Sequence, residues 1–291
     1  MLLGDDPLHL DRTTIRMALV ASAIAALVGE VWLVWHVEEP FDLLGLVVRW
    51  LFILVNGLFL ARFVSRWLGG RVATATVFAL CFTLSVVTGI VGRLEMLCTV
   101  GAMYAFARQA IAGRLPIDDS RRTRWVSWIV LAILILCFRW SLGVVIVAIW
   151  FLFALVTQNS RLLRRLLNPI GLAIFAVSLA LSIWVIDIPI LATYDHLRPY
   201  TSGNELNAYD FFLLLLPWWP LVLVTLYFGL RHGYYVLPLF QFIVIWLLVT
   251  VLAILLDFLP TPDGLIALTP SLAVAVAPAL TPLFRLVVRR R

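Results

Sequence analysis

The chain has 291 residues, of which 63% are apolar and only 13% are charged, and it carries a net charge of +6. A soluble domain of this size needs a polar surface around its core, so the composition excludes water-soluble enzymes, nucleic-acid-binding domains and disordered proteins. Apolar runs of about 20 residues follow one another along the chain, each long enough to cross a hydrocarbon layer of about 30 Å. The sequence therefore predicts an all-α, polytopic membrane protein.

The apolar runs predict ten transmembrane helices, joined mostly by short connections that make neighbouring helices antiparallel. Their approximate ranges are 15–37, 41–64, 72–92, 93–111, 125–140, 141–157, 169–187, 210–230, 234–258 and 264–287. Polar residues within the third and fifth runs also allow a count of nine or of eleven. We expect one transmembrane domain over residues 1–291, with a single long outer-face loop over residues 188–209.

The distribution of arginine predicts the orientation of the chain. All 22 basic residues are arginines, and with a cytoplasmic N-terminus 18 of them fall on the inner side. The remaining four lie at or near the outer face: Arg49, Arg93, Arg139 and Arg198. Because basic residues accumulate on the cytoplasmic side of membrane proteins, both termini are predicted to be cytoplasmic.

The residue types also restrict the chemistry of the chain. It has no lysine, which excludes Schiff-base chemistry, lysine-held pyridoxal phosphate and the P-loop lysine. Its three cysteines lie inside apolar runs without CxxC spacing, and its four histidines are scattered singly. Neither pattern is typical of a zinc site, so we predict no metal site and no cofactor.

Two opposite charges interrupt the first two apolar runs at a matched depth. Glu30 lies seven residues before Val37, and Arg49 lies eight residues after Phe41. At 1.5 Å per residue, both lie about 10–12 Å below the outer surface. An ion in hydrocarbon must face the bundle interior, a water-filled cavity or a partner. We therefore predict a structural ion pair between Glu30 and Arg49 across the first helix hairpin.

The predicted outer face also collects carboxylates and a few arginines. Its members are Glu38, Glu39, Asp42, Arg93, Glu95, Arg139, Asp187, Asp210, Asp257 and Asp263. Arginine binds phosphate through two parallel hydrogen bonds, and a carboxylate accepts a proton. The set therefore suits a substrate with a phosphate to hold and a hydroxyl to deprotonate, while solvated charges at the rim give the same list.

Three motifs follow one another in a recognisable order. The run from Arg66 to Arg71 leads into an apolar helix and then into Arg93, Glu95 and Met96. The runs Arg161-Leu162-Leu163-Arg164-Arg165-Leu166-Leu167 and Tyr209-Asp210-Phe211-Phe212 with Pro217-Trp218 come later. Over roughly residues 45–285 the chain resembles a divergent, shortened member of the GT-C superfamily of integral-membrane glycosyltransferases. That superfamily includes the protein O-mannosyltransferases and the aminoarabinose transferase of lipid A.

The resemblance implies an enzyme that takes a sugar from a polyprenyl-phosphate carrier at the outer face of the bacterial cytoplasmic membrane. It implies that Arg93 and Arg139 hold the phosphate, that Glu38, Glu39 or Asp42 accepts the proton, and that Glu95 assists. The partners it implies are membrane lipids and the polyprenyl-phosphate sugar donor, and none of them is a nucleic acid.

The first outer connection departs from the family pattern, because only Glu38, Glu39 and Pro40 separate the first two apolar runs. An alternative interpretation is therefore a non-catalytic subunit of a larger membrane complex, in which faces rich in Trp and Phe dock against other helices. A transporter is the third interpretation. It is disfavoured because the sequence shows neither inverted repeats nor a midplane cluster of polar groups.

Overall fold

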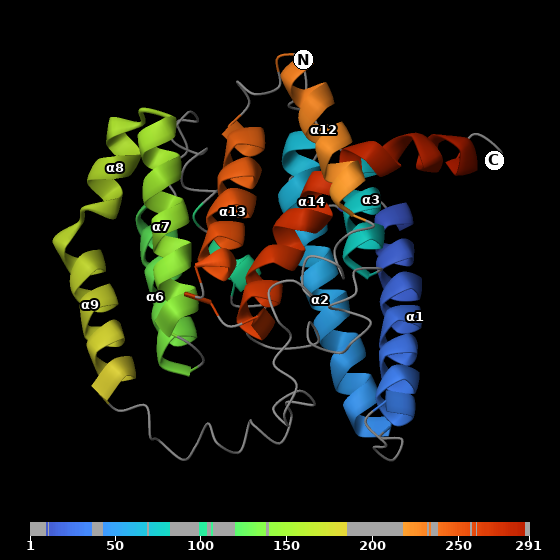
Figure 1. Ribbon diagram of the computed structural model, residues 1–291, viewed down its shortest axis with the longest axis horizontal. Helices are drawn as coiled ribbons and strands as arrows, with labels where there is room; N and C mark the ends of the chain where they lie inside the picture. The colour runs from blue at the N-terminus through green and yellow to red at the C-terminus, as the bar shows by residue number, and fades with distance from the viewer. Residues whose placement is uncertain are drawn as a thin grey trace. The chain divides into compact units, whose positions relative to one another are not determined.

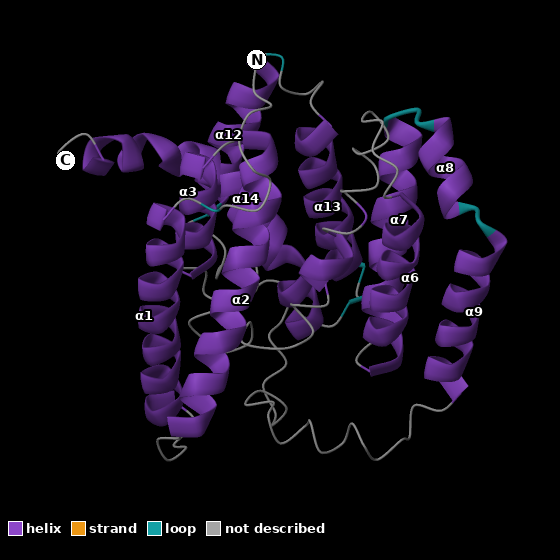
Figure 2. Cartoon of the chain, turned by 180° about the vertical axis from the view of Figure 1, so that it is seen from behind, coloured by secondary structure: helices purple, strands orange, loops and turns teal. Residues whose placement is uncertain are grey.

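The computed structural model shows a chain of α-helices (Figure 1). The structure describes residues 10, 12–36, 43–68, 70–81, 99–103, 106, 120–137, 140–184, 218–231, 233, 238–256, 258–259 and 261–288. Within these residues every regular element is a helix and none is a strand (Figure 2). The all-α class predicted from the sequence is therefore confirmed.

The described helices follow the apolar runs of the sequence. They are α1 (Arg12–His36), α2 (Leu43–Leu68), α3 (Gly70–Cys81), α6 (Ser120–Cys137), α7 (Trp140–Val156), α8 (Ser160–Leu166), α9 (Pro169–Trp184), α12 (Trp219–Arg231), α13 (Pro238–Leu255) and α14 (Thr261–Val288). All except α8 overlap a run that the sequence predicts to cross the membrane. The short helix α8 falls in a connection where the sequence analysis predicted no helix.

Among the described helices, three segments are long and apolar enough to cross a membrane by themselves. They are Arg12–Val31 of α1, Leu43–Ser65 of α2 and Pro238–Leu255 of α13. Six shorter apolar helices, of 10 to 17 residues, occur elsewhere in the described parts of the chain. A helix needs about 20 apolar residues to span the hydrocarbon layer, so the three long segments identify a membrane protein.

Contacts along the chain divide it into two compact units, each built from separate stretches of sequence. The first consists of Met1–Gly92, Leu215–Phe228 and Leu272–Arg291, and the second of Arg93–Leu214 and Gly229–Ser271. The helices α1, α2 and α3 therefore belong to the first unit, and α6 to α9 with α13 belong to the second. Both α12 and α14 contribute residues to the two units.

In the first unit, α1 packs against α2 and α3, which also pack against each other. The side chains of α1 are distributed in the opposite way to those of a helix in a soluble protein. Its buried side carries small and polar residues such as Thr14, Ala18 and Ser22, while large apolar residues such as Val20 and Leu27 are 59% and 50% exposed. Small residues let membrane helices approach closely, so the large apolar side chains of α1 form a lipid-facing surface.

The second unit has an aromatic core. The rings of Phe106 and Trp150 stack with their centroids 4.9 Å apart and their planes 9° from parallel. Phe153 and Phe242 pack edge-to-face beside them, with centroids 5.2 Å apart. These rings are buried, and the large areas over which they touch stabilise the core through dispersion contacts.

A hydrogen bond between helices supports the proline-containing turn of α14 in the second unit. Pro270 has no N–H group, so the carbonyl oxygen of Ile266, four residues earlier, lacks its helical partner in this turn. The indole Nε1 of Trp246 on α13 donates to the carbonyl oxygen of Ala267, 2.8 Å away. Another polar contact between helices runs from Ser182 Oγ on α9 to the carbonyl oxygen of Ile135 on α6, 3.0 Å away. Such contacts satisfy polar groups that hydrocarbon would leave unpaired.

Candidate functional site

The residues predicted to perform catalysis and to bind phosphate lie outside the described parts of the chain. They are Glu38, Glu39 and Asp42 in the interval 37–42, Arg93 and Glu95 in the interval 82–98, and Arg139 in the interval 138–139. The long outer loop predicted over residues 188–209 also lies outside. The only predicted site residues whose side chains are described are Glu30 and Arg49.

The structure brings Glu30 and Arg49 together within the first unit. Glu30 lies near the end of α1 and Arg49 near the start of α2. These two positions meet because the two helices form an antiparallel hairpin (Figure 1). One guanidinium nitrogen of Arg49, Nη1, lies 2.7 Å from Oε2 of Glu30. The contact is an ion pair by its distance, and the orientation of the guanidinium group is not that of a hydrogen bond between these two atoms.

Burial makes this ion pair energetically important. The side chain of Glu30 is 2% exposed and that of Arg49 is 19% exposed. Two ions taken out of water lose their hydration energy, and their mutual attraction compensates only while both remain in place. The pair is neutral as a whole, so it is compatible with apolar surroundings, whereas either ion alone is not.

Asn56 adds a second polar position that the sequence analysis missed. It lies seven residues after Arg49 on α2, which is two helical turns farther along the same face. Its side chain is 0% exposed, and neither Oδ1 nor Nδ2 has a hydrogen-bond partner in the described part of the structure. The signal was available, since Asn56 is the only Asn, Gln, Ser or Thr between Arg49 and Arg62.

Glu30, Arg49 and Asn56 together form what we call the hairpin polar site. Transfer of an amide into an apolar environment costs several kcal/mol unless a hydrogen bond compensates, so Asn56 is an expensive residue at this position. Ionisable and strongly polar groups inside a membrane protein are functional candidates for this reason. The site offers one neutralised ion pair and, deeper on α2, a free donor and acceptor.

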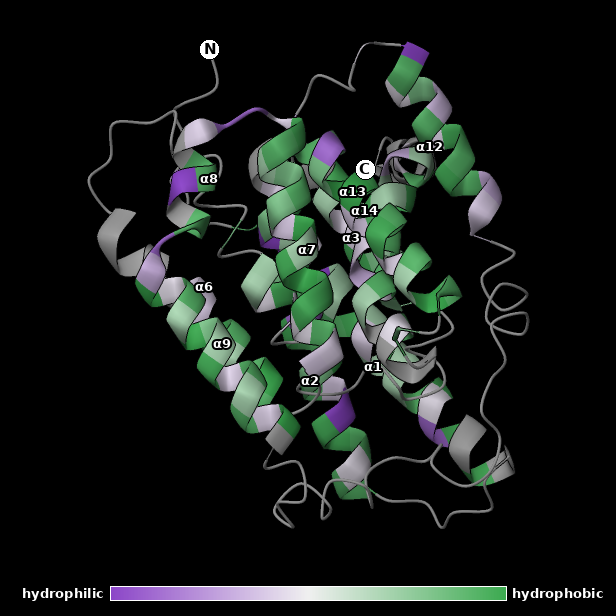
Figure 3. Cartoon of the chain, turned by 60° about the vertical axis from the view of Figure 1, so that its left-hand side comes forward, coloured by the Kyte–Doolittle hydropathy of each residue, from purple (hydrophilic) through white to green (hydrophobic). Residues whose placement is uncertain are grey.

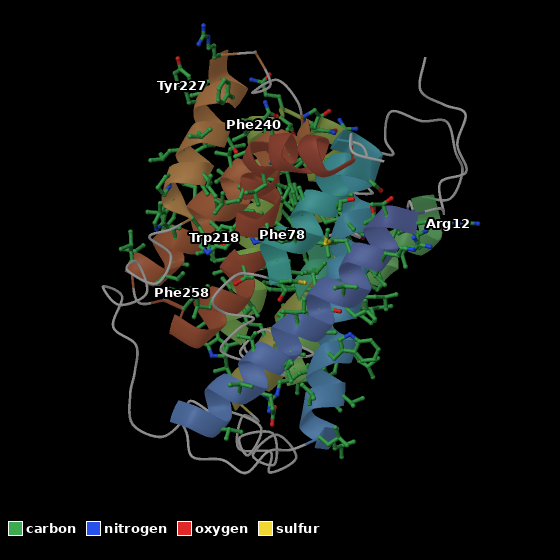
Figure 4. The ribbon with its side chains drawn as sticks, turned by 90° about the vertical axis from the view of Figure 1, so that its right-hand side faces the viewer. Arg12, Phe78, Trp218, Tyr227, Phe240 and Phe258 are labelled. Atoms are coloured by element: carbon green, nitrogen blue, oxygen red, sulfur yellow. The ribbon has the colours of Figure 1, made fainter. Side chains whose placement is uncertain are left out.

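The other end of α1 is fixed by a different contact. The hydroxyl oxygens of Thr14 on α1 and Thr74 on α3 lie 2.9 Å apart, and both side chains are buried. Thr14 lies 16 residues before Glu30, about 24 Å along the helix. Arg12, the first residue of α1, extends away from the helices (Figure 4). α1 is thus tied to α3 near its arginine-bearing end and to α2 near its acidic end.

Metal chemistry has no support in the described residues, where no group of three His, Cys, Asp or Glu side chains comes together. Cys81 is buried and free at the end of α3, as expected for a cysteine that packs in a core. The side chains of the other two cysteines, Cys98 and Cys137, are outside the described set.

The fold and the hairpin polar site together define the chain as an α-helical membrane protein with a buried ion pair. Comparisons with protein-family models, with curated proteins and with solved structures found no match for the chain.

Proposed function

We propose that the chain spans the bacterial cytoplasmic membrane ten times, with both termini in the cytoplasm and an active site on the outer face. The arrangement of arginines within each helical hairpin supports this topology. Arg12 and Arg16 at the start of α1 lie at the same end of the first hairpin as Arg62 near the end of α2, while Glu30 and Arg49 lie toward the other end. Accumulation of arginine at one end is the pattern expected of cytoplasmic ends.

Cysteine labelling tests this topology in intact cells. In a variant whose three native cysteines are replaced by alanine, single cysteines are introduced near residue 8, near residue 118, after residue 288 and near residue 203. An impermeant thiol reagent should label only the cysteine near residue 203, because the other three positions are proposed to be cytoplasmic. Labelling near residue 118 in intact cells would overturn the topology.

The function that we propose on this topology is transfer of a sugar from a polyprenyl-phosphate carrier, as in the GT-C glycosyltransferases. Arg93 and Arg139 would hold the phosphate. One of Glu38, Glu39 and Asp42 would accept the proton from the acceptor hydroxyl, and Glu95 would assist.

The observation that carries the proposal is the polarity of the α6–α7 hairpin. α6 ends at Cys137 and α7 begins at Trp140, so that Arg139 falls in the two-residue interval between them. The arginine-rich ends of this hairpin, at the start of α6 and in α8, are at the opposite end (Figure 1). An arginine at the outer end of apolar helices requires an anion, which is either a carboxylate of the protein, such as Glu95 or Asp187, or a lipid phosphate, and the proposal assigns it to the lipid.

The pairing of Glu30 with Arg49 sharpens the assignment. Of the four arginines predicted at the outer face, Arg49 already has a carboxylate 2.7 Å away. It therefore has little charge left to offer a phosphate, and Arg93 and Arg139 are the better candidates. The Glu30–Arg49 pair contributes to the architecture of the first hairpin in this proposal and takes no part in the transfer.

Binding of a polyprenyl-phosphate analogue to the purified full-length chain tests the proposal. We expect the double variant Arg93→Ala/Arg139→Ala to lose most of its affinity, and Arg139→Lys to bind more weakly because an ammonium cannot reproduce the planar two-point contact. The matched control is Arg12→Ala/Arg16→Ala, which removes the same charge from the proposed inner face and should bind normally. Unchanged affinity of the Arg93/Arg139 variant would remove the phosphate site and favour a non-catalytic membrane subunit.

A further inference from the structure

The connection between α7 and α8 is a well-defined turn. Gln158 adopts a positive φ of 49°, the left-handed conformation that ends many helices. The N–H of Asn159 donates to the carbonyl oxygen of Ala154 at 3.1 Å, and the N–H of Gln158 donates to that of Leu155 at 3.0 Å. This pair of bonds is the Schellman motif, which satisfies the last carbonyls of α7 and redirects the chain.

The helix α8 begins at once and is fixed against the second unit. The side-chain Oδ1 of Asn159 accepts a hydrogen bond from the N–H of Leu162 at 3.1 Å, which caps the new helix. Leu162 and Leu166, one helical turn apart, are 2% and 4% exposed, and α8 packs against α7. The cap and the two buried leucines therefore fix α8 in the fold, although it is only seven residues long.

Three arginines share one face of α8. Arg161, Arg164 and Arg165 have the i, i+3, i+4 spacing that places side chains beside one another on a helix. Arg164 is exposed. Leu162 and Leu166 are buried and Arg164 is exposed, so the side of α8 that carries Arg164 faces away from the packed interior.

Three further arginines lie at the same end of the second unit. Arg121, Arg122 and Arg124 lie in the first turns of α6. The start of α9 lies beside the middle of α6, because a Cβ at Gly171 would lie only 2.6 Å from ring atoms of Trp128, and farther along Ser182 of α9 donates to the carbonyl oxygen of Ile135. The two helices therefore run parallel, and the first turns of α6 extend beyond the start of α9 on the side from which α8 leads into it. The backbone positions of the six arginines thus lie toward one end of this unit. We call these six residues the junction cluster.

The protein supplies little negative charge to the junction cluster. No Asp or Glu occurs between Ser120 and Trp184. Asp118 and Asp119 precede α6 outside the described residues, and two carboxylates cannot neutralise six guanidinium groups. The remaining positive charge must therefore be balanced by an anion outside this part of the chain.

Exposed apolar side chains place the junction cluster at the edge of the hydrocarbon layer. At the end of α7, Leu155 and Val156 are 56% and 51% exposed, and beyond α8 Leu167 and Ile170 are 52% and 54% exposed. Figure 3 shows the same change, from hydrophobic residues along α7 and α9 to hydrophilic residues around α8. Arginines directly beside lipid-facing apolar residues lie at the level of the phospholipid headgroups.

We propose that the junction cluster is a binding site for anionic phospholipid headgroups in the membrane leaflet on its side, separate from the outer-face site. The planar guanidinium group binds phosphate oxygens through two parallel hydrogen bonds, and clustered arginines next to apolar spans favour anionic over zwitterionic lipid. The capped backbone of α8 fixes three of the arginine positions on one short helix before lipid arrives, which lowers the entropic cost of binding. This inference stands whether or not the chain transfers a sugar.

Native mass spectrometry of the full-length chain in detergent tests the site. The protein is titrated with phosphatidylglycerol and, in parallel, with phosphatidylcholine. We expect the unmodified chain to retain phosphatidylglycerol preferentially, and Arg161→Gln/Arg164→Gln/Arg165→Gln to bind it about tenfold more weakly or worse. The matched control Arg289→Gln/Arg290→Gln/Arg291→Gln removes the same charge elsewhere and should retain the lipid.

A melting curve in lipid-free detergent shows whether the triple variant is folded. If it is not, the single variant Arg164→Gln replaces it, because this exposed side chain contributes little to packing, and it should weaken phosphatidylglycerol binding by a few-fold. Three results would each overturn the proposal: undiminished binding by a folded junction variant, equal binding of the two lipids by the unmodified chain, or an equal loss in the control triple.

Discussion

The interiors of the two units of this protein contain different kinds of interaction. In the first, α1 presents Thr14, Ala18 and Ser22 to its neighbours, and its specific contacts are the Glu30–Arg49 ion pair and the Thr14–Thr74 hydrogen bond. In the second, the interior is filled by large rings, among them Trp150 and Phe106. Both interiors are buried, but the polar contacts of α1 stand out in the first and the contacts between rings stand out in the second.

This contrast follows from the solvent that surrounds a membrane protein. Lipid tails are as apolar as leucine, so burying another apolar side chain gives helices little reason to associate. Association then depends on close approach of small residues, on polar pairs, or on dense packing of large rings. In the first unit α1 uses the first two means, whereas the second unit combines the third with the hydrogen bonds from Trp246 and Ser182. Mutations should therefore affect the two units in different ways.

The largest effect is expected from separating Glu30 and Arg49. Replacing either residue alone, as in Glu30→Ala or Arg49→Ala, leaves an unpaired buried ion and should lower the free energy of unfolding by about 3–5 kcal/mol. Replacing both, as in Glu30→Leu/Arg49→Met, should be nearly neutral because no charge remains buried. Unfolding in detergent measures all three variants. Equal stabilities of the two single variants and the double variant would show that the residues are not coupled.

A smaller effect is expected from filling the contact between α6 and α9 in the second unit. In Gly171→Ala the new Cβ would lie 2.6 Å from the indole ring of Trp128, a rigid group that itself packs on Trp150. Overpacking of this kind costs about 1–3 kcal/mol of stability.

The matched control for this variant lies in the first unit. A Cβ at Gly57 meets Val77 Cγ1 at an ordinary 3.6 Å. Gly57→Ala should therefore be neutral or stabilising by up to about 1 kcal/mol, because alanine favours the helix. Thermal unfolding of both variants measures the difference, and equal tolerance of alanine at the two positions would contradict the tighter packing of the second unit.

The smallest effect is expected from the hydrogen bond between Trp246 and α14. Trp246→Phe keeps an aromatic ring beside Phe242 but removes the donor that binds the Ala267 carbonyl. Trp150→Phe is the control, because the Nε1 atom of Trp150 is also buried but has no hydrogen-bond partner in the described structure. We expect Trp246→Phe to cost about 1 kcal/mol more than its control in the free energy of unfolding. If the two variants lose the same free energy of unfolding, the loss comes from the smaller ring and the hydrogen bond contributes nothing.

Much of the architecture follows from the sequence alone. Apolar runs determine where helices form in a membrane protein, because the backbone must satisfy its own hydrogen bonds in hydrocarbon. The run predicted over residues 15–37 became α1, Arg12–His36, and the run over residues 141–157 became α7, Trp140–Val156. The proximity of Glu30 and Arg49 followed from counting residues inward from one surface, since both helices begin or end there.

Other features required the tertiary structure. The helix α12 begins at Trp219 within the span predicted over residues 210–230, and residues 210–217 of that span lie outside the described part of the chain. Pro220 stands in its first turn, where the missing N–H leaves no bond unmade. The helix α8 was not predicted, because it depends on the turn at Gln158 and on the fit of Leu162 and Leu166 to the surrounding helices.

The stacking of Phe106 on Trp150 could not be derived from the sequence either. Phe106 and Trp150 are 44 residues apart, and nothing in the local sequence of either residue specifies the other. Hydropathy and helix periodicity describe how one segment meets its surroundings, so they determine which residues are in the membrane and roughly at what depth. Which helix faces which, and therefore which side chains share a core, depends on packing between segments distant in sequence, and only the tertiary structure decides it.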